Sequence, residues 1–593
     1  MNINALVVLA YLVGTIGFGW YLSRFVKKGE DFFLAGRSLN KWVIAGMIMA
    51  TNVAAIYLVG PAGAAYAGGG VSVLLIAWTG NMLAAASALF FVPRLRRLEI
   101  TTVSELIETR YNVGLRLLVS ALWILYYALF AGNAMYTLST VLSPVLGLSQ
   151  LQIIWFVSGA VILYCFFSGL MAAAYSSVIQ SFLMIIGGLI LLPLCLKHPA
   201  VGGVSGLTSQ LGESAFTFWK SSADVWPNYK HIFMFALLGL PYWCTSQYML
   251  QCSFAGKNVR HASRGLIIAG AITGVLTLSF IIPGMCGTLI YAADPLGTGD
   301  SILPKLLNDV LPIGIGGIII AALVAASNST AAALLNAAAT LTEHDFYRRF
   351  FPNASSKHGI WVGRAAILCC GLLGLVFALQ VERLGGIIKA NFAIMSFFEP
   401  PIFVIVAAAL FSRRVNSIGA LAAMLGGIGL GIYSWQTGMG DETRTFLAFP
   451  VCSVLLLIGS MIGNRMGKKQ EEELAASDQF IERAKGALPL DFGVATGRIG
   501  IGVAIVGLVA FVLVSVFEAH VPKPLNLFCI VTAMLAFVGG CYMAVEVFVP
   551  IPEGEDEDAG EELTGIRGLL ASGKSWLALG AFAAILVTVL YLI

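Results

Sequence analysis

The sequence predicts an all-α polytopic membrane protein. Of the 593 residues, 58% are hydrophobic and only 11% are charged, and the mean hydropathy is +0.88. Too few charged side chains are present to cover the surface of a soluble protein of this size. Apolar runs of roughly 18–25 residues recur along the chain, and each can cross the ~30 Å hydrocarbon core of a bilayer.

Each long apolar run is a candidate membrane span. The first lacks a basic leading region and a small-residue cleavage site, so we expect it to be retained as a span. The candidate spans are 5–25, 41–65, 72–93, 117–144, 150–170, 175–197, 231–252, 263–291, 311–341, 360–380, 388–411, 416–436, 446–465, 500–517, 524–549 and 576–593.

Basic residues cluster after alternate spans. Loops such as "AYAGGG" and "ADPLGTGDS" carry no lysine or arginine. The positive-inside rule therefore places the N-terminus outside, and the count of spans places the C-terminus outside as well. The basic clusters follow the first, third, seventh, ninth and eleventh candidate spans, and they include Arg24, Lys27, Arg94, Arg97, Lys257, Arg260, Arg348, Arg349, Arg413 and Arg414.

Two polar segments interrupt the later part of the chain. Residues 464–497 form a candidate cytoplasmic segment, and 553–565 form an acidic linker whose simplest interpretation is a solvated loop. The ten cysteines lie mostly in apolar runs without C-x-x-C spacing, which favours packing thiols over metal ligands.

Two spans carry helix-breaking residues in mid-run. Gly60, Pro61 and Gly63 lie in the second span, and Gly239 and Pro241 lie in the seventh. Glycine and proline are common in membrane helices, so one such helix would carry little weight. Interrupted helices at matching positions of two halves, five spans apart, indicate an inverted repeat with a central site, as in secondary transporters.

A polar cluster, "SNST", stands in the middle of the apolar run 311–341. Ala326, Ser329 and Thr330 are spaced i, i+3 and i+4, so they share one helix face. The hydroxyls could simply bond back to carbonyls one turn earlier. Alternatively, with carbonyls near Ala50 and Val53 of the broken second span, they offer neutral oxygens that suit an alkali cation.

At this point the sequence resembles the sodium:solute symporter family, relatives of the sodium/glucose cotransporters with a LeuT-type fold. The resemblance runs from about residue 30 to residue 426. It depends on ordered blocks that include "EDFFLAGRSLNKWVIAGMIMATNVAA", "VPRLRRLEITTVSELIETRYN", "SGLMAAAYSSVIQ", "YWCTSQYMLQCSFAGKNVRHASRG", the run around "SNST", and "PPIFVIVAAALFSRRVNSIGA".

The resemblance implies an inverted repeat of five plus five helices. One N-terminal and about five C-terminal spans would be additional, giving about 14–16 in total. The expected units are an N-terminal span and loop at 1–40, a first repeat at 41–197, an extracellular loop at 198–230, a second repeat at 231–411, and a C-terminal extension at 412–593.

The resemblance also implies a sodium site. Na⁺ is expected on the main-chain oxygens of Ala50, Val53 and Ala326 and on the hydroxyls of Ser329 and Thr330. Some relatives use an aspartate to help bind a second Na⁺, but Ser177 stands at that position here. The sequence therefore predicts one intact sodium site.

The substrate pocket departs further from the sugar-binding pattern. Tyr57, Ala77, Ser246, Thr273 and Phe392 occupy positions where sugar-binding relatives carry mostly polar or charged side chains. A sugar needs many paired hydrogen-bonding groups. We therefore expect a smaller aromatic pocket, and its predicted lining residues are Asn52, Tyr57, Trp78, Trp243, Thr245, Ser246, Gln247 and Phe392.

Glu399 is an ionisable residue deep inside the eleventh span, directly before Pro400 and Pro401. Such a residue is costly in a membrane and is a functional candidate by default. The functional hypothesis is that it binds a proton or an amine of the substrate. The structural alternative is a protonated acid that caps carbonyls freed by the prolines.

The leading functional prediction is a sodium-coupled symporter that imports a small organic solute, with a sugar or related metabolite as first guess. Its partners would be Na⁺, the solute and the lipid bilayer, with no nucleic acid. The alternatives are a proton-coupled, amine or organic-acid carrier that uses Glu399, or a transporter-like sensor. No HExxH, GxSxG or P-loop motif is present, so we do not expect an enzyme.

Overall fold

The computed structural model describes residues 13–14, 17, 39–53, 55–220, 226–297, 299–312, 315–464, 479–484, 495–517 and 523–549. Three predicted features lie outside the described residues: nearly all of the first span (5–25), the acidic linker (553–565) and the last span (576–593). Most of the polar segment 464–497 also lies outside them.

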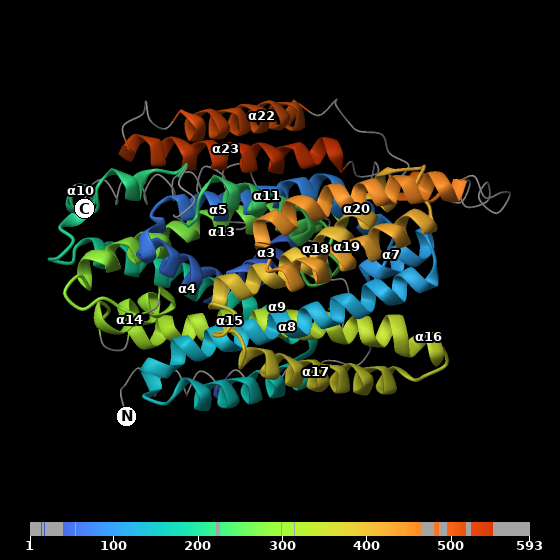
Figure 1. Cartoon of the computed structure of the whole chain (residues 1–593), viewed down its shortest axis with the longest axis horizontal. Helices are drawn as coiled ribbons and strands as arrows, with labels where there is room; N and C mark the ends of the chain where they lie inside the picture. The colour runs from blue at the N-terminus through green and yellow to red at the C-terminus, as the bar shows by residue number, and fades with distance from the viewer. Residues whose placement is uncertain are drawn as a thin grey trace, which may run out of the picture.

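Within the described residues the regular elements are all helices, and ten are long and apolar enough to cross a membrane. One bent pair of helices would make an eleventh span (Figure 1). The helices of the first half are α3 (Lys41–Asn52), α4 (Ala55–Ala64), η3 (Ala65–Gly69), α5 (Ser72–Ala86), η4 (Ser87–Phe91), α6 (Val92–Arg97), α7 (Val103–Arg110), α8 (Val113–Leu146), α9 (Gln150–Leu196), α10 (Gly203–Leu211) and η5 (Glu213–Phe216).

The second half and the C-terminal extension continue the bundle. Their helices are α11 (Tyr229–Cys244), α12 (Gln247–Phe254), α13 (Val259–Ile290), η6 (Gly299–Ser301), α14 (Ile302–Asp309), α15 (Ile315–Leu341), η7 (Thr342–Tyr347), α16 (Arg348–Phe350), α17 (Ser356–Ala378), α18 (Ile387–Phe411), α19 (Ser417–Thr437), α20 (Asp441–Asn464), α22 (Ala495–Val516) and α23 (Lys523–Phe548).

The predicted spans match these helices closely, with one difference. The runs 150–170 and 175–197, which the sequence predicts as two spans, both lie within α9. Side chains of α9 are described at 150–167 and 181–196.

Asparagine caps set where several of the helices begin. Asn40, Asn112, Asn258 and Asn416 precede α3, α8, α13 and α19 with extended backbone. Each side-chain oxygen accepts a hydrogen bond from an N–H of the first turn, which has no partner within the helix. The polar residue that ends each loop therefore starts the next helix.

The first broken helix bends by 50° between α3 and the helical segment 57–69. The break falls after Asn52, where Val53 leaves helical geometry at φ −84° and ψ 46°. Gly60, Pro61 and Gly63, the residues that predicted it, lie inside or near the end of α4. The sequence therefore predicted the broken span correctly but placed the break several residues too late.

The second broken helix is displaced in the other direction. Gly239 and Pro241 lie within α11, and the helix is interrupted at Thr245 and Ser246, before α12. The Pro241 carbonyl accepts from both Thr245 N–H (2.9 Å) and Ser246 N–H (3.0 Å). The Thr245 hydroxyl bonds the same carbonyl, which favours leaving the helix here.

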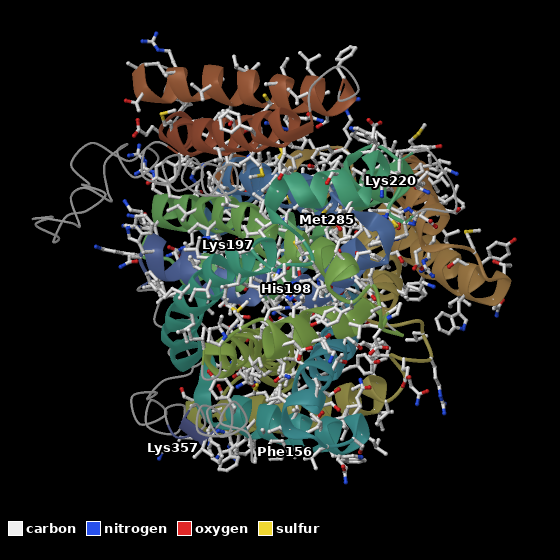
Figure 2. All side chains as sticks on the ribbon, turned by 90° about the vertical axis from the view of Figure 1, so that its left-hand side faces the viewer. Phe156, Lys197, His198, Lys220, Met285 and Lys357 are labelled. Carbon is white, nitrogen blue, oxygen red and sulfur yellow. The ribbon has the colours of Figure 1, made fainter. Side chains whose placement is uncertain are left out.

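The outer surface of the bundle is apolar, as a lipid-facing surface requires. Phe156 on α9 is 48% exposed, whereas Met285 on α13 is only 1% exposed (Figure 2). Further exposed apolar side chains occur on α17, α19, α20 and α22. Contact of this surface with water would be unfavourable, whereas contact with the hydrocarbon of a bilayer is favourable.

The helix pair α22–α23 lies along one edge of the bundle (Figure 1). Arg264 of α13 pairs with Glu546 of α23 at 3.1 Å, and Arg260 Nε donates to the carbonyl of Val549 at 2.8 Å. A Cβ added at Gly274 of α13 would meet the Met534 side chain at 3.1 Å, so small residues allow this close packing. The extension is thus joined to α13 by charge and by shape.

Candidate functional site

The polar cluster of α15 is buried inside the bundle, and Thr330 contacts the end of α3. Ser329 and Thr330 are each 2% exposed. The Thr330 hydroxyl donates to the main-chain carbonyl of Thr51 at 2.7 Å. This bond joins α15 to the last turn of α3, between Ala50 and Val53. Polar oxygens of both helices therefore meet inside the bundle.

The other predicted sodium ligands lie on the same two elements. Ala50 and Val53 are each 1% exposed, at the end of α3 and directly after it. Ala326 lies one turn before Thr330 in α15, and its backbone is helical. The described residues contain no group of three or more His, Cys, Asp or Glu side chains that could hold a metal ion. The oxygens gathered here are neutral, and such hard oxygen donors suit an alkali ion.

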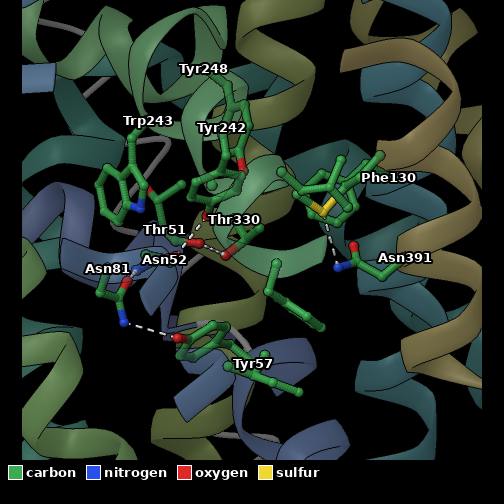
Figure 3. A pocket seen from close by; sticks show the side chains of 16 residues that line it. Thr51, Asn52, Tyr57, Asn81, Phe130, Tyr242, Trp243, Tyr248, Thr330 and Asn391 are labelled. Carbon is green, nitrogen blue, oxygen red and sulfur yellow. Dashed lines mark hydrogen bonds between the residues drawn. The ribbon is translucent and has the colours of Figure 1, made fainter. Parts of the chain in front are cut away.

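A cavity of about 90 Å³ opens next to this junction (Figure 3). A cavity needs roughly 10–15 Å³ to hold one water molecule, so several waters or a small solute could enter. None of the described residues that line it carries a charge. Its lining residues are Thr51, Asn52, Tyr57, Ile76, Gly80, Asn81, Phe130, Phe235, Leu238, Gly239, Tyr242, Trp243, Tyr248, Thr330, Asn391 and Met395.

A chain of hydrogen bonds crosses one wall of the cavity (Figure 3). The Tyr242 hydroxyl donates to Asn52 Oδ1 at 2.7 Å, and Asn52 Nδ2 donates to Asn81 Oδ1 at 3.2 Å. Asn81 Nδ2 then donates to the Tyr57 hydroxyl at 2.9 Å, which itself donates to the Ala77 carbonyl at 3.3 Å. These contacts link both broken helices through α5.

Asn52, Tyr57 and Trp243, three of the predicted pocket residues, line the cavity. Thr330 joins them, so the predicted sodium region and the predicted pocket share one space. We infer that a solute in the cavity would contact the helix break itself.

The other predicted pocket residues are not among the lining residues. Trp78 Nε1 donates to the Gly274 carbonyl at 2.9 Å, and Thr245 bonds Pro241. Phe392 packs edge to face on Phe235, with ring centroids 4.3 Å apart.

Gln247 and Ser246 also have other contacts. Gln247 accepts from Val103 N–H at 2.7 Å and donates to the Thr101 carbonyl at 3.1 Å, which fixes the start of α7. The Ser246 hydroxyl lies 3.5 Å from the Tyr127 hydroxyl.

Several lining residues were missed by the sequence analysis, chiefly Asn81, Tyr242, Tyr248 and Asn391. Asn81 is a lone amide in the apolar run 72–93, so it could have been noticed as a buried polar group. The tyrosines gave no comparable signal, because aromatic residues are frequent throughout the chain.

Glu399 lies next to Tyr126 of α8 and is fully buried (0% exposed). The Tyr126 hydroxyl donates to its Oε1 at 2.6 Å. The carboxyl is not among the lining residues, so an amine in the cavity would not touch it in this conformation. The side chain of Ser177, at the position tied to a second sodium ion, lies outside the described side chains.

A family model described as the sodium:solute symporter family matches residues 32–427. The chain belongs to this family. It is 28% identical to the sodium/glucose cotransporter 4 of Danio rerio over 72% of this chain and 70% of that protein. It is 27% identical to the sodium/glucose cotransporter of Vibrio parahaemolyticus over 73% of this chain and 84% of that protein.

A solved structure shares the fold. This is the substrate-bound outward-open state of a Na⁺-coupled sialic acid symporter, with a TM-score of 0.69 and 20% identity, covering 78% of this chain and 98% of that one. The LeuT-type fold predicted from the sequence is thereby confirmed. The protein is an integral membrane symporter that couples sodium to the movement of a solute.

Proposed function

We propose that one sodium ion binds where α15 meets the break after α3. The main-chain oxygens of Ala50, Val53 and Ala326 and the hydroxyls of Ser329 and Thr330 would hold it. The observation that carries the proposal is the 2.7 Å contact between the Thr330 hydroxyl and the Thr51 carbonyl, because it brings the two sets of oxygens together.

The burial of these groups supports the same proposal. An ion that has lost its water needs oxygens around it, and this buried junction brings oxygens of two helices together. The break after Asn52 leaves carbonyls of α3 without the N–H donors of a continuing helix. A cation at this junction would contact both the carbonyls at the break and the oxygens of the buried hydroxyls.

The adjoining cavity is proposed as the solute site. Its aromatic faces and its amide–tyrosine chain suit a small solute with a few hydroxyls, so a sugar or a related metabolite remains the first proposal. The two relatives are named for glucose, which supports the same class. Tyr242 and Asn52 would supply both the polar contact and the link to the sodium region.

Sodium entry supplies the driving force. Moving one charge through a membrane potential of 100 mV yields about 2.3 kcal/mol. Since about 1.4 kcal/mol is a factor of ten, one Na⁺ with a neutral solute supports roughly 40-fold accumulation from the potential alone. The transport cycle would then carry net charge.

The arrangement in the membrane is also proposed here. The repeats would span 41–197 and 231–411, with 198–230 outside, 412–593 as an extension, and both termini outside. An accessibility assay with impermeant thiol reagents at single cysteines in these loops would test this topology.

Alanine substitutions of the two hydroxyl residues test the sodium site. In Thr330→Ala and Ser329→Ala, we expect the sodium concentration for half-maximal uptake to rise at least tenfold, because a ligand oxygen is lost. The solute would first be found by thermal-shift screening of purified protein against metabolites, with and without Na⁺. Uptake in proteoliposomes would then be measured.

Thr342→Ala is the matched control, because the Thr342 hydroxyl bonds only the helix carbonyl of Ala338 (2.7 Å) among its contacts in the described residues. It should leave sodium dependence unchanged. Unaltered sodium dependence in both Ser329→Ala and Thr330→Ala would refute the proposed site.

A second candidate is a proton-coupled or amine carrier that uses Glu399. The separation of Glu399 from the cavity lining argues against direct contact with an amine. Uptake that persists without Na⁺ and increases at low external pH would favour proton coupling over the sodium proposal.

A further inference from the structure

Glu399 is a buried acid in the middle of α18. It lies 12 residues after Ile387, where the helix starts, which corresponds to about 18 Å along the helix axis at 1.5 Å per residue. Its side chain is completely buried. It is neither one of the proposed sodium ligands nor one of the described residues that line the cavity.

The hydrogen bonding of Glu399 is incomplete. Oε1 accepts from Tyr126, whereas Oε2 is buried and has no hydrogen-bond partner among the described residues. An ionised carboxylate offers acceptors on both oxygens and needs donors or a cation for each. With one donor and no cation, burial favours the protonated acid.

The other fully buried acids in the described chain differ in this respect. Asp345 is paired with Arg116, and Glu343 is paired with Arg348, each at 2.5 Å. Glu399 forms no ion pair with a described residue. Among these three acids it is therefore the one that has no cationic partner among the described residues.

The titratable groups that face Glu399 are phenols. They come from α8, α11 and α12, and they are Tyr126, Tyr127, Tyr242 and Tyr248.

The charged groups on or against α18 contact other atoms. Arg444 of α20 bonds Ser396 and Asp441, and Arg110 of α7 bonds the carbonyls of Ser412 and Val415. Near its N-terminal end lie Lys389 on α18, Glu442 on α20 and Asp300 of η6, whose Oδ2 accepts from Ile387 N–H at 3.4 Å. The described residues of α4 and α19 carry no charged side chain.

Packed rings connect Glu399 to the cavity. Tyr126 contacts Phe130 with ring centroids 5.6 Å apart, and Phe130 contacts Tyr248 at 6.1 Å. Tyr248 packs on Tyr242 at 5.9 Å, and the Tyr242 hydroxyl reaches Asn52. Asn52 directly follows Thr51, whose carbonyl receives the Thr330 hydroxyl. Four packed aromatic rings therefore connect the acid to the helix break that carries the proposed sodium oxygens.

Charge balance relates the two positions. The proposed sodium ligands are all neutral, so a bound ion brings an uncompensated positive charge into a medium of low dielectric constant. A positive charge nearby favours the ionised form of a carboxyl group, and the effect is reciprocal. Ionised Glu399 would favour sodium, and protonated Glu399 would oppose it.

We propose that Glu399 is a proton-binding site that exchanges with sodium: it is protonated when the sodium site is empty and releases its proton when sodium binds. The inference rests on the proposed sodium site. No bond other than the O–H bond of the acid changes, and the proton passes to solvent. The exchange reduces the net positive charge that the bundle holds in the loaded state.

Proton release on sodium addition tests this inference directly. Purified protein in a weakly buffered solution with a pH indicator would receive NaCl, with choline chloride as the ionic-strength control. We expect the wild type to acidify the solution by up to one proton per bound Na⁺, whereas Glu399→Gln should release none. Sodium binding would be followed in parallel by the fluorescence of Trp243, which lines the cavity.

The pH dependence of sodium affinity gives a second measurement. In the wild type the half-saturating sodium concentration should rise by up to tenfold per unit fall in pH where the acid is protonated. In Glu399→Gln it should stay flat. Asp309→Asn, which alters an exposed ion pair with Lys305, should behave as the wild type.

Tyr126→Phe protects the test against a Gln variant that fails to fold. Loss of the donated hydrogen bond should retain proton release but shift its pH range upward. If sodium binds to the wild type without proton release, and with the same pH dependence in Glu399→Gln, the inference is wrong. If the wild type shows no sodium response at any pH, the proposed sodium site itself fails.

Discussion

Asp345 and Glu399 are both completely buried acids, yet their surroundings are opposite. Asp345, in η7, accepts hydrogen bonds from Thr102 (3.0 Å), Ser104 and Ser120 and pairs with Arg116. Glu399 has one donor among the described residues. Asp345, which lies in η7 directly after α15, is therefore compensated by Arg116, whereas Glu399, in the middle of α18, has no cation beside it among the described residues.

The difference separates a structural acid from a responsive one. Asp345 has four donors, one of which is the Arg116 guanidinium, and these contacts fasten η7 to α7 and α8. A carboxyl group with one donor can hold or lose a proton as its surroundings change. Burial alone does not identify a functional acid; the number of its partners does.

Asp345→Asn should give the largest effect on stability. It leaves Arg116 buried without its main anion, and breaking such a pair costs about 3–5 kcal/mol. We expect a clear fall in the thermal unfolding temperature of the purified protein. Glu399→Gln removes no ion pair and should unfold close to the wild-type temperature. Equal destabilisation by both variants would break the comparison.

Removal of one hydroxyl donor beside each acid sharpens the comparison. Ser120→Ala takes one of four donors from Asp345, and Tyr126→Phe takes the single donor from Glu399. Ser120→Ala should cost about 1 kcal/mol of stability and leave the pH dependence of sodium binding unchanged. Tyr126→Phe should move that pH dependence. The reverse assignment, with sodium binding altered only by Ser120→Ala, would contradict the distinction.

The smallest expected effect concerns Glu108, which extends the cluster around Asp345. Burial opposes its ionisation, but bonds to Arg116 and Arg349 together hold the pKa of this carboxyl below its usual value. A lowered pKa means that the stabilisation is present above the unfolded-state value, about 4.3, and is lost as the pH falls through the folded-state value.

We therefore expect the thermal unfolding temperature to drop slightly as the pH is lowered from about 5 to about 3, and Glu108→Gln to reduce this drop. Sodium binding near neutral pH should be the same in Glu108→Gln as in the wild type. A changed sodium response there would show that the two acidic regions are not independent.

Much of the fold could be predicted from the sequence because span length and hydropathy are local properties. The long helices from α5 to α23 follow the apolar runs closely, except that α9 joins two of the runs. The breaks were displaced because the sequence shows only where glycine and proline stand. Asn52 bonds Tyr242 across the bundle, and Thr245 bonds Pro241, and these contacts accompany the actual breaks.

The site was predicted in part for the same reason. Thr330 and Asn52 were recognised as polar groups inside apolar runs. The partners Tyr242 and Asn81 were missed because their role arises from contacts between helices that are distant in sequence. Gln247 stays a predicted solute residue; its amide bonds Val103 and Thr101 at the start of α7, a contact that only the arrangement of the helices reveals.

The attachment of α23 to α13 has a mechanical consequence. Because Arg264–Glu546 and the Met534–Gly274 contact join the two helices, a tilt of α13 would be transmitted to the lipid-exposed α22 as a lateral displacement. Cys529 on α23 is half-buried and Cys369 on α17, across the bundle, is exposed. Spectroscopic labels on these two cysteines would therefore report movements of the interior as a change in the distance between α23 and α17.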